Sequence, residues 1–231
     1  MSERYLLVKH SEGWNFDRVC RWMSANQKEF DWFYPTLGEP FPDPKQYRGV
    51  IVFGGAPSAN DDDEHPWVIS ELAFIENCLK DEINFFGICL GAQMLARVLG
   101  SNICAHKDGL TEIGLCRVEP TEAGRDFMPE PLTVMQWHKE SYDLPAGAVN
   151  LARSDAFENQ AFQYNDRTYG VQFHPEVNPE CLAIWHERNK AKSPDQFNDA
   201  QRAAMMTDAH EHDANISAWL DGFLTGWTAP G

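Results

Sequence analysis

The chain has 231 residues, a formal net charge of −16 and a hydrophobic content of 43%. This length suffices for one large α/β domain with its own core, and the negative charge argues against nucleic acid and anionic membranes as partners. The chain has no run of about eighteen apolar residues and no C-x-x-C pairs among its six cysteines, and its start does not resemble a signal peptide, so we expect a cytoplasmic protein with reduced thiols.

The first half of the chain alternates apolar runs of strand length with segments of helical spacing. The predicted strands are Tyr5–Val8, Phe30–Tyr34, Val50–Phe53 and Ile83–Ile88, and the predicted helices are Asn15–Ser24, Pro66–Leu79 and Leu90–Leu99. Such alternation with short connections favours an α/β fold: an open, mostly parallel twisted sheet with helices on both faces. Glycine-bearing turns follow the third and fourth strands, at the edge where open α/β sheets bind their ligands.

The second half of the chain is richer in strands. These are predicted at Asn102–Ala105, Glu112–Val118, Leu132–Trp137, Val149–Ala152, Ala161–Tyr164 and Thr168–Phe173. The chain turns helical from Pro179, and the polar residues 187–213 are predicted to form a helical excursion over the surface. An apolar stripe from Ile216 to Leu224 is expected to dock the C-terminus on the core. We find no repeat or linker, so we expect residues 1–231 to form one domain.

Cys89 lies where a predicted strand turns into a predicted helix, with Gly87 and Gly91 two residues to either side. This is the thiol version of the G-x-S-x-G nucleophile elbow, in which the glycines permit a tight turn and close packing. The start of a helix also favours thiolate over thiol, and thiolate is the nucleophilic form. The alternative is an inert core cysteine, but the flanking glycines favour a nucleophile.

A cysteine nucleophile needs a base and a group that orients the base. His174 follows the strand that ends at Phe173, so it shares the edge of Cys89 if that strand is parallel, and Glu176 comes two residues later. Taken alone, His174 is better explained as a hydrogen-bonded turn residue. Together with the elbow, the three residues predict a thiolate, an imidazole and an orienting carboxylate, so Cys89, His174 and Glu176 are the candidate catalytic residues.

The remaining histidines give no comparable signal. We expect solvated side chains at His210 and His212, which lie in a polar helical stretch, and we predict no metal site. No motif surrounds the others, His10, His65, His106 and His186.

These two segments resemble the catalytic blocks of class I glutamine amidotransferases. The blocks are Gly87–Gln93 and Gly170–Glu176, and their order and separation are also similar to that family's. Within the family, the chain most resembles stand-alone proteins similar to the amidotransferase domain of GMP synthase. The resemblance implies an attack of Cys89 on the side-chain amide of glutamine, a γ-glutamyl thioester and release of ammonia, with no cofactor.

The resemblance also implies further site residues. The loop after the third strand resembles the family's oxyanion loop, which assigns the backbone N–H groups of Gly55 and Leu90 to the oxyanion hole. The segment from Gln136 to Pro145, which contains His138, resembles the substrate-pocket segment. Gln93, His138, Lys139 and Glu140 are therefore the expected substrate-binding residues.

Two departures from the family pattern bear on the substrate. Ala56 stands where the family has the proline that follows the two glycines, and His138-Lys139-Glu140 replaces His-Gly-Asp. The second change puts the substrate in question, since Lys139 and Glu140 suit a γ-glutamyl compound that is bulkier or more charged than glutamine.

Three functions remain open from the sequence. The phosphate loop of the GMP synthase partner domain is absent, so the first hypothesis is a subunit that supplies ammonia to a separate synthase. The second is an independent hydrolase or transferase of γ-glutamyl amides or peptides. The third is a non-catalytic binding protein of the same fold, which the intact triad disfavours.

Overall fold

The computed structural model describes residues 3–13 and 15–229, whose strands form one sheet of nine and a separate pair. The strands are β1 (Tyr5–Val8), β2 (Phe30–Phe33), β3 (Gly49–Val52), β4 (Asn84–Ile88), β5 (Ile103–Ala105), β6 (Glu112–Pro120), β7 (Leu132–His138), β8 (Glu140–Tyr142), β9 (Val149–Arg153), β10 (Ala161–Asn165) and β11 (Thr168–Val171). The helices are α1 (Arg18–Ala25), α2 (Trp67–Lys80), α3 (Leu90–Val98), α4 (Pro179–Lys192) and α5 (Asp199–Trp227), and two short 3₁₀ helices lie between β2 and β3, η1 (Pro35–Leu37) and η2 (Pro44–Gln46).

The large sheet has the order β2-β1-β3-β4-β11-β10-β9-β6-β7. The five strands from β2 to β11 are joined by parallel pairs, whereas β10, β9, β6 and β7 extend the sheet through antiparallel pairs. β5 and β8 form the separate antiparallel pair. β8 was not predicted: it has three residues, as β5 has, but Glu140-Ser141-Tyr142 lacks the apolar run that marks β5.

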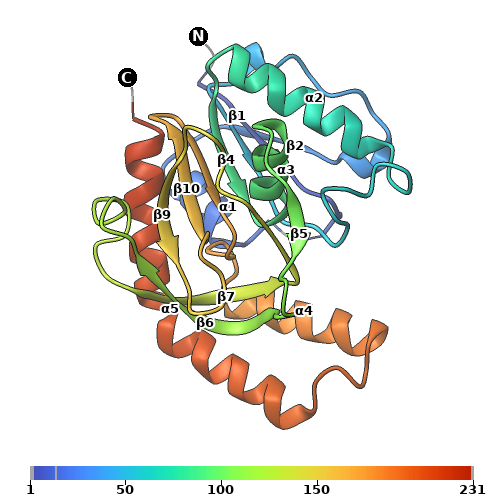
Figure 1. The fold of residues 1–231 in the computed structure, drawn as a ribbon, viewed down its shortest axis with the longest axis vertical. Helices are drawn as coiled ribbons and strands as arrows, with labels where there is room; N and C mark the ends of the chain where they lie inside the picture. Colours follow the sequence, from blue (N-terminus) through green and yellow to red (C-terminus); the bar gives the residue numbers. More distant parts are fainter. Residues whose placement is uncertain (1–2, 14, 230–231) are drawn as a thin grey trace.

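Helices cover both faces of the sheet (Figure 1). Because side chains alternate along a strand, Tyr5 and Leu7 pack with α1 and α5 on one face, while Leu6 and Val8 pack with α2 and α3 on the other. The predicted fold class, an open and mostly parallel sheet with helices on both faces, is confirmed.

The segment 187–213 comprises the end of α4, a turn and the first half of α5. α4 and α5 pack on β7 through an apolar cluster of Met135, Val177, Cys181, Leu182 and Ala209. In Figure 1, α4 and the first part of α5 form the lower part of the molecule, beneath β6 and β7, and the rest of α5 runs up beside the sheet to the C-terminus. This placement brings α4 to the same edge of the sheet as the predicted site, which the sequence did not indicate. No helix in the described ranges combines the length and the apolar character needed to cross a membrane.

Candidate active site

Cys89 sits at a sharp turn between β4 and α3, with φ of 50° and ψ of −106°. Positive φ is uncommon for a residue with a side chain, and such backbone strain clusters at functional sites. The turn also depends on its two glycines. A Cβ on Gly91 would lie 2.2 Å from the carbonyl oxygen of Val52, and one on Gly87 would lie 2.6 Å from the carbonyl carbon of Gly91.

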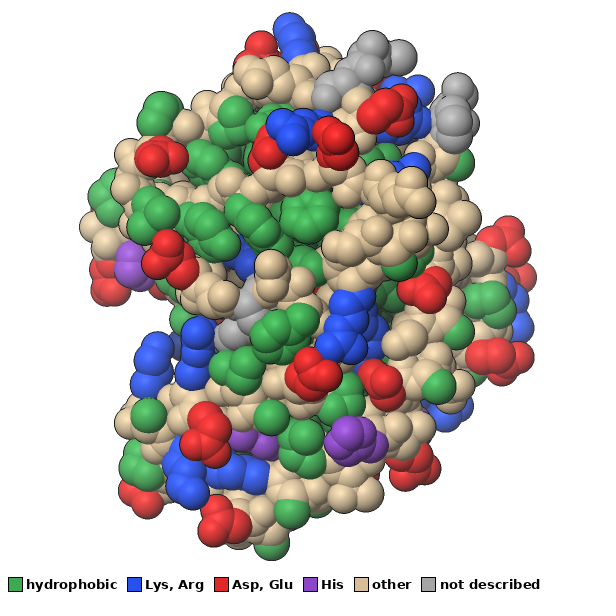
Figure 2. Space-filling view, turned by 180° about the vertical axis from the view of Figure 1, so that it is seen from behind, with side chains coloured by type: hydrophobic (Ala, Val, Ile, Leu, Met, Phe, Trp, Pro, Cys, Tyr) green, Lys and Arg blue, Asp and Glu red, His purple; other side chains and the backbone are tan. Residues whose placement is uncertain are grey.

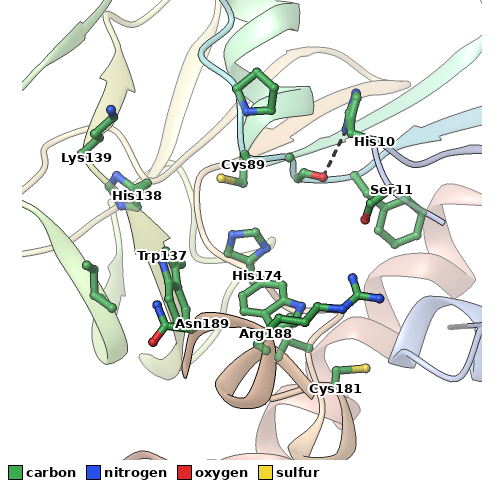
Figure 3. Close-up of a pocket in the computed structure, with 18 of the residues that line it drawn as sticks. His10, Ser11, Cys89, Trp137, His138, Lys139, His174, Cys181, Arg188 and Asn189 are labelled. Atoms are coloured by element: carbon green, nitrogen blue, oxygen red, sulfur yellow. Dashed lines mark hydrogen bonds between the residues drawn. The ribbon is translucent and has the colours of Figure 1, made fainter. Parts of the chain in front are cut away.

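The parallel pairing of β4 with β11 brings Cys89 and His174 together. Ile88 pairs with Val171, and the Cys89 N–H donates to the Val171 carbonyl at 2.8 Å. The His174 N–H in turn donates to the Met135 carbonyl at 2.8 Å, which fastens the segment after β11 to β7. The predicted common edge is therefore correct, and Figure 3 shows both side chains facing the same cavity.

His174 is held by Glu176. His174 Nδ1 lies 2.8 Å from Glu176 Oε1, and both side chains are buried. Burial lowers the pKa of His174, but the charges of Glu176 and Cys89, and hydrogen bonds to both, raise the pKa to about 10. Since Nδ1 faces Glu176, Nε2 is the ring nitrogen that serves Cys89. The arrangement fits the roles predicted for the three residues, a nucleophile, a base and an orienting acid.

Arg18, a buried residue of α1, hydrogen-bonds the turn that carries Glu176. The Arg18 N–H donates to the Glu176 carbonyl at 2.9 Å, and its guanidinium donates to the carbonyls of Pro175, at 3.0 Å, and Val177. The guanidinium also contacts Asp213 on α5. No sequence pattern indicated this role, because Arg18 stands far from the turn along the chain.

The loop after β3 approaches the same point. A Cβ on Gly54 would lie 2.6 Å from Cε1 of His174, and one on Gly55 would lie 2.7 Å from Cδ2 of Leu90. Leu90 is the first residue of α3, a position whose N–H has no acceptor within the helix. The two backbone groups predicted for the oxyanion hole thus come from segments that lie against each other and against the triad.

Two buried glutamines connect Cys89 with the predicted substrate segment. Gln93 Nε2 donates to the Glu140 carbonyl at 3.0 Å and lies 3.3 Å from Gln172 Oε1. Gln172 Nε2 in turn contacts Cys89 Sγ at 3.6 Å. Gln172 was missed by the sequence prediction, although it stands inside the second catalytic block.

His138 is engaged by protein groups at both ring nitrogens. Its Nε2 lies 3.1 Å from Oε2 of buried Glu112, and its Nδ1 lies 3.0 Å from the Glu140 carbonyl. Only 2% of the His138 side chain is exposed. His138 therefore holds the backbone at Glu140, and it lines the cavity together with Lys139 and Glu140.

The cavity has a volume of about 770 Å³ and reaches from the triad to α4. The rings of His174 and Trp185 are 5.0 Å apart, and those of Trp185 and Trp137 are 5.6 Å apart. The lining from α4 and the turn after it consists of Cys181, Trp185, Arg188, Asn189, Lys192, Ser193 and Gln196. None of these was predicted as a site residue, and the aromatic Trp185 within a polar helix was the available signal.

Basic side chains mark the cavity of this acidic protein. Lys9, Lys139, Arg188 and Lys192 line it, and Lys9 forms an ion pair with Asp17 at 2.7 Å. Figure 2 shows a notch between the upper and lower parts of the molecule, with Lys and Arg side chains gathered beside it. Within residues 3–13 and 15–229, no three His, Cys, Asp or Glu side chains are grouped to hold a metal ion.

Comparisons with known proteins agree with this geometry. Residues 21–183 match the family glutamine amidotransferase class-I. The chain is 28% identical to gamma-glutamyl peptidase 5 of Arabidopsis thaliana, over 76% of this chain and 72% of the relative. It is 32% identical to a subunit of glutamine-hydrolyzing GMP synthase from Archaeoglobus fulgidus, over 60% of this chain and 72% of the relative. The crystal structure of a glutamine amidotransferase from Thermotoga maritima superposes with a TM-score of 0.91, at 31% identity and 98% coverage of both chains.

Proposed function

The chain belongs to the class I glutamine amidotransferase family, and we propose that it hydrolyses γ-glutamyl amides through a thioester on Cys89. The observation that carries this proposal is the strained turn that places Cys89 beside a His174 held by Glu176. The six cysteines are free thiols, which suits the cytoplasmic location that we include in the proposal.

In the first half of the reaction, the Cys89 thiolate attacks the γ-carbonyl carbon and His174 holds the proton taken from the thiol. The N–H groups of Gly55 and Leu90 hydrogen-bond the oxyanion of the tetrahedral intermediate. Protonated His174 then gives its proton to the leaving nitrogen as the carbon–nitrogen bond breaks. The products are the free amine, or ammonia, and a γ-glutamyl thioester on Cys89.

In the second half, neutral His174 takes a proton from water, and the hydroxide attacks the thioester carbonyl. The same N–H groups stabilise the second oxyanion. Collapse of this intermediate breaks the carbon–sulfur bond, releases glutamate and returns the proton from His174 to Cys89. Glu176 keeps the imidazole oriented and stabilises its charged form in both halves.

The leaving group that best suits the cavity is larger than ammonia. A volume of about 770 Å³ falls in the range of pockets that hold drug-sized ligands, whereas glutamine is a small amino acid. The space beyond His174 is bounded by Trp137, Trp185 and Arg188. We assign this space to the amine part of a γ-glutamyl peptide, with Arg188 near its terminal carboxylate. A relative named gamma-glutamyl peptidase 5 supports this choice.

The second candidate function is the supply of ammonia to a separate synthase. The similarity to a subunit of glutamine-hydrolyzing GMP synthase favours it. In that case glutamine is the substrate, and the synthase closes the side of the cavity next to α4. Sites of this kind reach their final geometry only on closure.

The turnover number of the purified protein distinguishes the two candidates. We expect glutamate release from γ-glutamyl dipeptides at about 1 s⁻¹ or faster, unchanged by cell extract, and slower release from glutamine. Slow turnover of glutamine alone that rises when extract is added would instead support the ammonia-supplying role. No turnover of any substrate under either condition would contradict both candidates and support a binding protein.

The Arg188→Ala variant tests the leaving-group assignment. We expect KM for a γ-glutamyl dipeptide with a free carboxylate to rise about 10-fold, because a charged hydrogen bond is worth roughly 1.5–3 kcal/mol. The effect on the corresponding dipeptide amide should be smaller. Lys190→Ala is the matched control, since Lys190 stands on the same helix and pairs with Asp199 outside the cavity lining. Equal effects of Arg188→Ala on the acid and the amide would contradict the assignment.

A further inference from the structure

A buried histidine–glutamate pair contacts the loop that carries Gly54 and Gly55. His10 follows β1, and its Nδ1 lies 3.1 Å from the carbonyl oxygen of Gly54, the contact dashed in Figure 3. Its Nε2 lies 3.1 and 3.0 Å from the two carboxylate oxygens of Glu71 on α2. The exposed fractions of the two side chains are 2% and 0%. No residue of this pair takes part in the reaction proposed above.

The proton on Nδ1 follows from its partner. A backbone carbonyl only accepts hydrogen bonds, so Nδ1 must carry a hydrogen and donate it to Gly54. Nε2 then shares one proton with Glu71, which fixes the ring in this orientation. Burial lowers the pKa of His10, but the charge and hydrogen bond of Glu71 raise it above the ordinary value. Trp67 packs against the ring, with centroids 5.1 Å apart.

The Gly54 carbonyl and the Gly55 N–H belong to one peptide group. That group is planar and trans, so its carbonyl and its N–H point in opposite directions. A hydrogen bond that holds the carbonyl toward His10 therefore turns the N–H away from His10. His174 and Leu90 also lie close to this peptide: a Cβ on Gly54 would lie 2.6 Å from Cε1 of His174, and one on Gly55 would lie 2.7 Å from Cδ2 of Leu90 and 3.0 Å from the His10 ring.

Two adjacent glycines make this peptide easy to rotate, since neither flanking residue has a Cβ that restricts its backbone. A side chain at either glycine would have to displace a group at the site, because a Cβ on Gly54 would meet the His174 ring and one on Gly55 would meet Leu90 at less than 3 Å. A hydrogen bond from outside the loop, such as that of His10 to the Gly54 carbonyl, can fix the orientation of such a peptide.

We propose that His10, oriented by Glu71, is a positioning residue that locks the Gly54–Gly55 peptide so that the Gly55 N–H faces the oxyanion. The inference rests on the proposed thioester chemistry, in which that N–H stabilises both tetrahedral intermediates. It assigns a function to a histidine that no sequence motif marks. It also accounts for a buried ion pair, which by itself is weak evidence for stability.

A pair of double variants isolates the hydrogen bond to Gly54. His10→Leu/Glu71→Leu removes the donor and leaves no unpaired buried charge. His10→Asn/Glu71→Leu has nearly the same shape but places an amide donor where Nδ1 stood. We expect the Leu variant to lose about 10²-fold in kcat, as for loss of one oxyanion-hole donor, with KM changed less than about 3-fold. The Asn variant should recover at least 10-fold of that loss.

Equal kcat values for the two double variants, both with cooperative thermal unfolding, would overturn the inference. If the Leu variant does not fold, Glu71→Gln decides, because glutamine can hold the ring while His10 Nδ1 still donates to Gly54. We expect a loss in kcat below about 10-fold for Glu71→Gln, and a loss of 10²-fold or more would overturn the inference. Absence of turnover in the wild-type protein would refute the proposed function instead, so the two failures are distinct.

Discussion

The Cys89→Ala variant should lose γ-glutamyl amide hydrolysis by about 10⁶-fold, as when a triad nucleophile is removed. No other group in the lining can form the thioester, since burial raises the pKa of neighbouring Cys181 to about 12, which keeps that thiol protonated. The measurement is single-turnover release of glutamate from a γ-glutamyl dipeptide.

Cys181→Ala is the matched control, because it removes a buried thiol from the same cavity. We expect Cys181→Ala to lower the melting temperature and to leave the turnover number close to that of the wild type. Turnover in Cys89→Ala equal to that of the wild type would eliminate the thioester mechanism.

The His174→Ala variant should lose more turnover than the Glu176→Gln variant. His174 transfers protons in both halves of the reaction, so its loss should approach that of Cys89. Glu176 acts through His174, and removal of a triad acid costs roughly 10²-fold less than removal of the nucleophile or base. We therefore expect Glu176→Gln to retain measurable turnover with a near-normal KM.

The pH profile of Glu176→Gln tests the cause of this loss. In the wild-type protein the Glu176 carboxylate helps to raise the pKa of His174 to about 10, so the imidazolium that protonates the leaving nitrogen persists until high pH. Without the negative charge the pKa falls, and His174 loses its proton at lower pH. The alkaline limb of kcat should shift to lower pH in Glu176→Gln, and an unshifted limb would show that Glu176 does not set this pKa.

Local patterns were sufficient to predict the fold class and the common edge of Cys89 and His174. Each strand from β1 to β4 is an apolar run, and Gly87 and Gly91 flank Cys89 at fixed spacing. These features depend on residues near one another in the chain. β8 was not predicted because Glu140–Tyr142 is both short and partly polar, so no apolar run marks it.

The supporting contacts of the site were not predictable in the same way. Arg18 reaches the turn at Glu176, and Glu71 on α2 reaches His10 after β1, only because the packed sheet brings their elements together. A lone arginine or histidine carries no local pattern that distinguishes such a role from a solvated side chain. The cavity-lining residues of α4 were not predicted for a related reason, because the polar composition of this helix is also that of an exposed helix.

The most direct test that Cys89 is the nucleophile is covalent labelling by a diazo-ketone analogue of glutamine, with the labelled residue mapped by mass spectrometry. General alkylation with iodoacetamide provides the comparison, because Cys104 is exposed and should react with that reagent by access alone. We expect the analogue to modify Cys89 and to leave Cys104 and the four other cysteines unmodified. Modification of another cysteine with Cys89 intact would contradict this expectation.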